Sequence, residues 1–218
     1  MSLTVDHRTA QRVLDAAVQE FARGGYQGTS VRAVAARAGV SVRGLYAVLP
    51  SKQAMLAEVI DATYAALLSQ VRTFVHAARA DPAARLDAAV FAQCEFYARN
   101  PLTGAVARNE TRSLAPAARR RVHERSLQLT DVFGEILADG VDAGVFDLDD
   151  PATAAHALVS MCEAIPAWYA SGGSQSPRQL ARTYCALAAR MCGSDRNAAS
   201  RRSARHLAVV ATEHRLSA

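Results

Sequence analysis

Helix start signals recur along this chain. Asp81-Pro82, Asp150-Pro151 and Ser176-Pro177 each join a capping side chain to a proline, and Gln179 completes a capping box with the serine. A proline at the first helical position loses no helical hydrogen bond, and the capping oxygen accepts an otherwise unpaired N–H group. Apolar residues at steps of three and four follow each signal. The pattern predicts a succession of amphipathic helices.

The composition favours the same fold. Half of the 218 residues are apolar, only 6% are aromatic and alanine is abundant, whereas sheets favour aromatic and β-branched residues. We therefore expect an all-α protein with about nine helices. No uninterrupted apolar run has the length of a membrane span or signal peptide, so we expect a cytoplasmic protein with no membrane partner. The four cysteines are far apart in the sequence and are expected to be reduced thiols.

The first 52 residues show three helices separated by glycines and prolines. An apolar stripe runs from Arg8 to Phe21 and ends at Gly24-Gly25. Thr29 or Ser30 is then expected to cap a second helix that stops at Gly39, and Ser41 to cap a short third helix closed by Pro50. This spacing is typical of a helix-turn-helix, although an ordinary three-helix corner has similar spacing. We assign residues 1–52 to this domain.

A long helix is predicted next, from Lys52 to about Val75, as the only continuous link between two domains. Residues 53–193 are expected to form a helical ligand-binding and dimerisation domain. Asn100-Pro101 should end a helix, a shorter element should follow around residues 105–112, and Pro116 should open a long helix. Pro166 should kink or end the helix that starts at Pro151.

The formal charge of +5 is concentrated at the two ends of the chain. Residues 1–60 carry +3, residues 61–193 carry −1 and residues 194–218 carry +3. Basic ends suit a polyanion, although charge of this size also occurs on solvated surfaces. The tail 194–218 is expected to be a mobile terminus, with a basic arm that touches nucleic acid as the alternative.

A longer motif carries a family resemblance. From Thr29 to Leu56 the chain reads TSVRAVAARAGVSVRGLYAVLPSKQAML, behind a Phe21/Gly25 framework. This stretch resembles the signature of TetR-family regulators. The resemblance implies a dimeric, one-component transcriptional repressor that leaves its operator when a small molecule enters the C-terminal domain. Where the family usually has aromatic residues or histidines, this chain has Ala47 and Val48, so Arg43 and Tyr46 are expected to carry more of the DNA readout.

The third helix is the expected recognition helix. Leu45 and Leu49 are one turn apart and should face the domain core, which leaves the other side for DNA. Arg43 is the expected base reader, because its guanidinium matches guanine O6 and N7, with a phosphate contact as the alternative. Hydroxyl and ammonium groups at helix ends are phosphate candidates, although Thr29 and Ser41 equally suit simple capping. The expected DNA-binding residues are Thr29, Ser30, Ser41, Val42, Arg43, Gly44, Tyr46, Ala47 and Lys52.

A second resemblance lies downstream. The runs N-E-x-R-x-L-x-P from Asn109, G-x-F from Gly144 and W-Y-x-x-G-G-x-x-S-P from Trp168 resemble a family branch that regulates steroid and fatty-acid catabolism and senses CoA thioesters. It implies an acyl- or steroid-type CoA thioester as inducer. Polar and aromatic groups that interrupt apolar helix faces are pocket candidates, with core packing as the alternative. The expected pocket residues are Tyr64, Leu68, Cys94, Tyr97, Glu110, Arg112, Trp168 and Tyr169.

The last two helices are expected to pair with their symmetry mates in a four-helix bundle. The expected dimer contacts are Leu158, Ile165, Leu180, Tyr184 and Leu187. No paired-histidine metal motif, no G-x-S-x-G and no glycine-rich phosphate loop is present in the sequence, so we expect neither an enzyme nor a cofactor or metal. The competing hypothesis is a DNA-binding regulator of the same fold that senses no ligand.

Overall fold

The computed structural model describes residues 7–78, 80–170 and 173–194, so the expected tail 194–218 lies outside these residues except for Ser194. Ten α-helices and one 3-10 helix occur in this part of the chain, which contains no strand. The predicted all-α fold with about nine helices is confirmed. The helices are α1 (His7–Gly28), α2 (Val31–Ala38), α3 (Val42–Val48), α4 (Lys52–Ala77), α5 (Pro82–Arg99), α6 (Pro101–Glu110), η1 (Thr111–Ser113), α7 (Pro116–Asp142), α8 (Pro151–Glu163), α9 (Ile165–Trp168) and α10 (Pro177–Met191).

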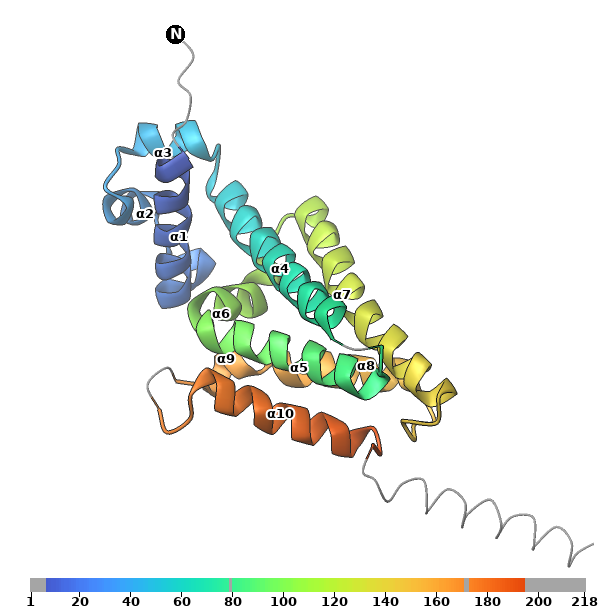
Figure 1. Ribbon diagram of the computed structural model, residues 1–218. Helices are drawn as coiled ribbons and strands as arrows, with labels where there is room; N and C mark the ends of the chain where they lie inside the picture. The colour runs from blue at the N-terminus through green and yellow to red at the C-terminus, as the bar shows by residue number, and fades with distance from the viewer. Residues whose placement is uncertain (1–6, 79, 171–172, 195–218) are drawn as a thin grey trace, which may run out of the picture.

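Helices α1–α3 form one end of the molecule, with α3 at the tip (Figure 1). Ser30 caps α2 and Ser41 caps α3, each accepting a hydrogen bond from a backbone N–H of the first turn. Gly39 ends α2 with a φ of 64°, a left-handed conformation that costs glycine little. The tight turn between α2 and α3 therefore follows from local residue chemistry.

Two apolar cores meet along α4. The N-terminal core joins α1–α3 to the first half of α4, including Met55 and Ile60, and to Val106 and Ala107 of α6. The second half of α4, including Leu67 and Val71, packs with α5, α7, α8 and α10. Helix α6 thus belongs in part to the core of the DNA-binding helices. Helix α4 extends through both cores, as expected of a continuous link, and α6 adds a second contact to the DNA-binding helices.

Helix α4 is long and apolar enough to cross a membrane by length and composition, with a mean hydropathy of 1.2 in its most apolar window. Its largest apolar residues are buried in the two cores instead. Packing inside the protein therefore accounts for its apolar sequence.

Helix boundaries in the middle of the chain depart from the sequence prediction in one place. The N–H of Asn100 closes α5, and Pro101 immediately occupies the first position of α6. The expected element around residues 105–112 therefore begins four residues earlier, because a proline that stops one helix also suits the start of the next. Pro166 ends α8 as predicted, and the short α9 follows.

Four of the five expected dimer contacts, Leu158, Ile165, Leu180 and Tyr184, are core residues of the single chain, and only Leu187 is exposed. Leu158, Ile165 and Leu180 have at most 1% of their surface exposed. They fill the space between helices of the same chain, so they are not available to a partner. Periodicity identified the apolar face of each helix without showing which neighbour covers it.

Two glycines of α7 provide a matched test of the packing. A Cβ on Gly140 would lie 2.0 Å from the ring of the fully buried Phe146, whereas one on Gly134 would meet nothing within 4 Å. Gly140→Ala should lower the free energy of unfolding by about 1 to 3 kcal/mol through overpacking. Gly134→Ala should raise it by about 0.5 to 1 kcal/mol, because alanine favours a helix over glycine. Urea unfolding of both variants measures the difference, and equal effects would contradict the packing.

Candidate DNA-binding surface and ligand pocket

The recognition helix α3 presents a mixed polar and apolar face to solvent. Its one fully buried side chain is Leu45, which anchors it on the N-terminal core. Arg43 and Ala47 are exposed, and Val42 and Tyr46 are exposed by 37% and 45%. Half-buried Gly44 donates its N–H to the Ser41 hydroxyl oxygen at 3.0 Å. The expected DNA-reading residues therefore lie together on one outer face.

The two residues before α2 have different environments. Ser30 is exposed and its hydroxyl oxygen accepts the N–H of Ala33, which leaves the hydroxyl hydrogen available. Thr29 is buried, and its hydroxyl lies within hydrogen-bonding distance of the carbonyl oxygens of Glu20, at 2.9 Å, and Gly25, at 2.8 Å. The expected phosphate contact by the Thr29 side chain is therefore withdrawn, because this side chain ties α1 to the start of α2.

Lys52 stands at the first position of α4 beside the DNA-binding helices. Its ammonium lies 4.3 Å from the ring centroid of Tyr26, a cation–π contact that orients the side chain. The N–H groups of an ammonium stay free to donate in such a contact. Lys52 therefore brings a positioned positive charge to a helix N-terminus.

Two polar contacts fix α2 against α1. The guanidinium of Arg12 donates to the carbonyl oxygens of Ala38 and Gly39 in the turn before α3. The buried carboxylate of Glu20 accepts from Arg37 of α2 and pairs with Arg23. Arg37's hydrogen bond, together with the charges of both arginines, holds the pKa of Glu20 below its usual value despite burial.

A cavity of about 260 Å³ lies between α4, α5, α6 and α8. It brings together three of the expected pocket residues, Tyr64, Tyr97 and Arg112. It also includes Arg108 and four residues that the sequence analysis did not assign to the pocket: Gly104, Ala107, Thr111 and Glu163. Arg108 and Arg112, one helical turn apart, are both exposed at its edge.

Glu163 is the unusual group of this cavity. Its Oε1 atom is buried and accepts no hydrogen bond within the described part of the chain. Burial raises the pKa of its carboxyl, and the charge of Arg108 only partly opposes this effect. Burial, and to a lesser degree the charge of Glu163, also raises the pKa of the Tyr64 and Tyr97 hydroxyls. At neutral pH both tyrosines are therefore neutral hydroxyls.

The other expected pocket residues lie elsewhere. Leu68 and Cys94 are core residues, and the Cys94 and Cys162 sulfurs are 3.4 Å apart. Glu110 accepts a hydrogen bond from Ser113, and the Tyr169 hydroxyl donates to the Gln175 carbonyl. Trp168 is 55% exposed and stacks on Tyr184. These five side chains serve packing, local hydrogen bonding or an outer surface, so they are removed from the pocket.

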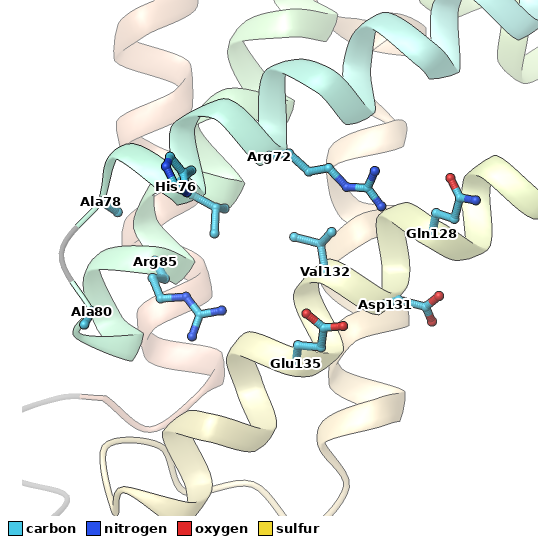
Figure 2. A pocket seen from close by; sticks show the side chains of 10 residues that line it. Arg72, His76, Ala78, Ala80, Arg85, Gln128, Asp131, Val132 and Glu135 are labelled. Atoms are coloured by element: carbon cyan, nitrogen blue, oxygen red, sulfur yellow. The ribbon is translucent and has the colours of Figure 1, made fainter.

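A larger groove of about 610 Å³ lies between the end of α4, the start of α5 and α7 (Figure 2). Arg72, His76 and Arg85 lie on one side of it, and Asp131 and Glu135 on the other. Arg85 also pairs with Asp139 at 2.6 Å. Ligand pockets are mostly apolar with a few placed polar groups, so the smaller cavity fits an inducer better than this charged surface.

Comparison with known proteins assigns the family. Residues 13–59 match the profile described as bacterial regulatory proteins, tetR family. Residues 79–192, more than half of the chain, match the tetracyclin repressor-like C-terminal domain. The chain belongs to the TetR family. Members of this family are transcriptional regulators and not enzymes, and this chain is a TetR-family transcriptional repressor.

Among curated relatives, the TetR-family chain is 28% identical over 177 residues to the transcriptional repressor KstR2 of Rhodococcus jostii, covering 80% of this chain and 86% of that one. KstR2 of Mycobacterium tuberculosis is 25% identical over 177 residues, covering 80% and 88%. Among solved structures, a tetR-family regulator from Rhodococcus RHA1 is 28% identical with a TM-score of 0.79, covering 84% and 96%. The regulator PfmR of Thermus thermophilus is 27% identical with a TM-score of 0.77, covering 82% and 97%.

In this TetR-family chain, the pocket helix is connected to the DNA-binding helices by specific contacts. The Gln53 amide, at the start of α4, donates to the Ser113 carbonyl and accepts the N–H of Ala115. Ser113 is the last residue of η1, which directly follows α6. The other two residues of η1, Thr111 and Arg112, line the cavity. These two hydrogen bonds join the end of the α6–η1 segment to the first turn of α4.

The Glu20 contact predicts a pH-dependent stability. Glu20→Gln should lower the free energy of unfolding at neutral pH by about 1 to 3 kcal/mol, because it weakens charge-assisted hydrogen bonds. The folded-state pKa of Glu20 is below its unfolded value of about 4.5, so this contribution is present above that pH and is lost as the pH falls through the folded-state value. The gap between wild type and variant in urea unfolding experiments should therefore shrink as the pH falls below the unfolded value of about 4.5. Glu58→Gln, at an exposed site of α4, is the control, and a gap that stays constant with pH would contradict the assignment.

Proposed function

We propose that the protein is a ligand-responsive repressor. It binds a palindromic DNA operator as a homodimer and is released by a small, largely apolar molecule. The exposed face of α3, which gathers Arg43, Tyr46 and Ala47 at the tip of the molecule, carries the DNA-binding part of the proposal (Figure 1). A protein with this partner acts in the cytoplasm, where the bacterial chromosome lies.

The contacts proposed for DNA divide into two kinds. Arg43 reads a guanine through two parallel hydrogen bonds, and Tyr46 and Val42 contact neighbouring base edges. Half-buried Gly44 adds no side-chain bulk and lets α3 approach the bases. Ser30, Ser41 and Lys52, at the starts of α2, α3 and α4, bind phosphates. One short helix reads few bases, so a dimer with recognition helices about 34 to 36 Å apart is required for specificity.

Arg43 and Lys52 provide the test of this division. The operator is first isolated by capture of genomic DNA fragments on the full-length protein and sequencing. Arg43→Ala should then weaken operator binding by about 1 to 3 kcal/mol and flatten the preference at one base position. Lys52→Ala should weaken operator and random DNA alike and reduce the salt slope by about one unit. Equal losses on both DNAs for Arg43→Ala would instead make it a phosphate contact.

The proposed dimer surface is an apolar strip on α9 and α10, defined by Trp168, Tyr184, Leu187 and Met191. Trp168, Leu187 and Met191 are exposed by 55%, 39% and 47% in the single chain. Their neighbour Tyr184 stacks on Trp168 with ring centroids 6.5 Å apart. Adjacent large apolar side chains on one outer face suit a partner surface. A second copy of the chain covers them in a symmetric contact.

An arginine in this strip should disrupt the dimer. Leu187→Arg would bury a charge opposite its own symmetry mate, and it should weaken dimerisation at least about tenfold, or 1.4 kcal/mol. Leu127→Arg is the matched control, because Leu127 is 41% exposed but lies on α7. Sedimentation equilibrium at micromolar concentration measures both. A wild-type monomer, or equal dimerisation of the two variants, would contradict the proposed surface.

The proposed inducer is an acyl- or steroid-type CoA thioester that enters the 260 Å³ cavity with its apolar part. Arg108 and Arg112 at the edge suit its negatively charged portion. The structural neighbour AibR was solved with isovaleryl coenzyme A and operator DNA, so the fold accommodates both kinds of partner. The inducer acts by displacing α6 and the start of α4. A tenfold release requires about 1.4 kcal/mol of coupling, within the usual allosteric range.

A further inference from the structure

The cavity between α4, α5, α6 and α8 has a polarity that narrows the chemistry of its ligand. Glu163 is half-buried with a buried Oε1 atom, and it lines the cavity together with the neutral hydroxyls of Tyr64 and Tyr97. Arg108 and Arg112 lie at the exposed edge, and neither forms an ion pair within the described residues. In the inner part of the cavity Glu163 Oε1 accepts no hydrogen bond from either tyrosine hydroxyl or from any other described group, and at the edge no anion pairs with the two arginines.

Glu163 occupies a position that is unfavourable for the protein alone. It is the last residue of α8, where the negative end of the helix dipole opposes a carboxylate. Its Oε1 atom is buried without a partner, although a buried acceptor without a donor costs about 1 to 3 kcal/mol. The described residues offer no compensation beyond the field of Arg108. A donor supplied by a bound molecule would remove this cost.

We propose that Glu163 determines the specificity of the pocket by selecting a ligand that carries a hydroxyl group on its apolar body. The hydroxyl donates to the buried Glu163 oxygen, and the anionic end of the same molecule pairs with Arg108 and Arg112. This inference rests on the proposed ligand-responsive function, and it narrows the ligand class to hydroxylated acids and their CoA thioesters. A ligand without the hydroxyl leaves the buried acceptor unpaired, and sites of this kind discriminate strongly.

Matched ligand pairs that differ by one hydroxyl test the proposal on the full-length protein. The probes are 3-hydroxybutyryl-CoA with butyryl-CoA, 3-hydroxydecanoyl-CoA with decanoyl-CoA, and lithocholate with 5β-cholanate. Isothermal titration calorimetry should show that the hydroxylated member of at least one pair binds wild type at least about tenfold more tightly. The preference should fall below about twofold in Glu163→Met, and part of it should return in Glu163→Gln, whose amide oxygen also accepts.

A measurement without ligand separates this role from ordinary packing. Glu163→Met removes a buried unpaired carboxyl, so it should raise the melting temperature of the free protein by about 2 to 4 °C. Burial raises the folded-state pKa of Glu163, so the wild-type penalty grows as the pH rises from the unfolded value of 4.5 through the folded one, and the gain should be larger at neutral than at acidic pH. The other titratable or charged groups that line the cavity with Glu163 are Tyr64, Tyr97, Arg108 and Arg112. Glu135→Met, on an exposed site of α7, is the control. It should not change the ligand preference, and it should not produce a pH-dependent gain in melting temperature.

Three results would overturn the proposal. In the first, wild type binds both members of every pair equally. In the second, Glu163→Met keeps the preference for the hydroxylated member. In the third, none of the six probes binds. Operator binding by wild type without any probe is measured in parallel. A wild-type protein that binds no operator would reject the proposed DNA-binding function, whatever the ligand measurements show.

Discussion

Helix α6 is packed on two sides, and the relation between the two halves of the protein depends on this packing. Val106 and Ala107 belong to the apolar core beneath the DNA-binding helices. Gly104 and Arg108 face the cavity, and a Cβ on Gly104 would lie only 2.7 Å from Pro166. The helix is therefore closely packed at Gly104 as well as on the N-terminal core. Close-packed cores rearrange between discrete packings and do not deform continuously, so a change at the cavity also changes the N-terminal core.

The buried Glu20 and the half-buried Glu163 have carboxyl groups in opposite environments. Glu20 is surrounded by Arg23 and Arg37, and its charge holds α2 against α1. Glu163 feels the charge of Arg108 but forms no ion pair with it, and its Oε1 atom has no hydrogen-bond partner in the described part of the chain. The same functional group therefore has opposite shifts in pKa, lowered at Glu20 by charge-assisted hydrogen bonds and raised at Glu163 by burial. Compensated polar groups stabilise a fold, whereas uncompensated ones are typical of binding sites.

At the DNA-binding end of the molecule, contacts with the rest of the domain hold α3 in place, and α3 exposes a small set of side chains. Arg12 binds the carbonyl oxygens of the turn before α3, and Leu45 anchors α3 from below. The outer face then carries Arg43 and Tyr46 beside the short side chain of Ala47. With few large groups on this face, the proposed readout rests on a guanidinium and a phenol. Their position is set by the scaffold because α3 is too short to be stable alone.

The sequence by itself determined the helices and their ends, because capping and proline effects act within one turn. Ser41, Asp81, Asp150 and Ser176 cap helices as their side-chain chemistry predicts. It also predicted that Leu45 faces the core and that Arg43 faces outward, because the apolar residue of a short helix identifies its inner face.

Only the tertiary structure decided which apolar faces are covered within the chain and which remain exposed. Leu158 and Leu187 follow the same kind of pattern, yet one is in the core and the other is on the surface. It also placed Thr29 inside and brought Glu163 against Tyr64 and Tyr97 from other helices. These outcomes depend on packing between segments far apart in the chain. The helical periodicity of the sequence predicts the apolar face of one helix but not which segment packs on it.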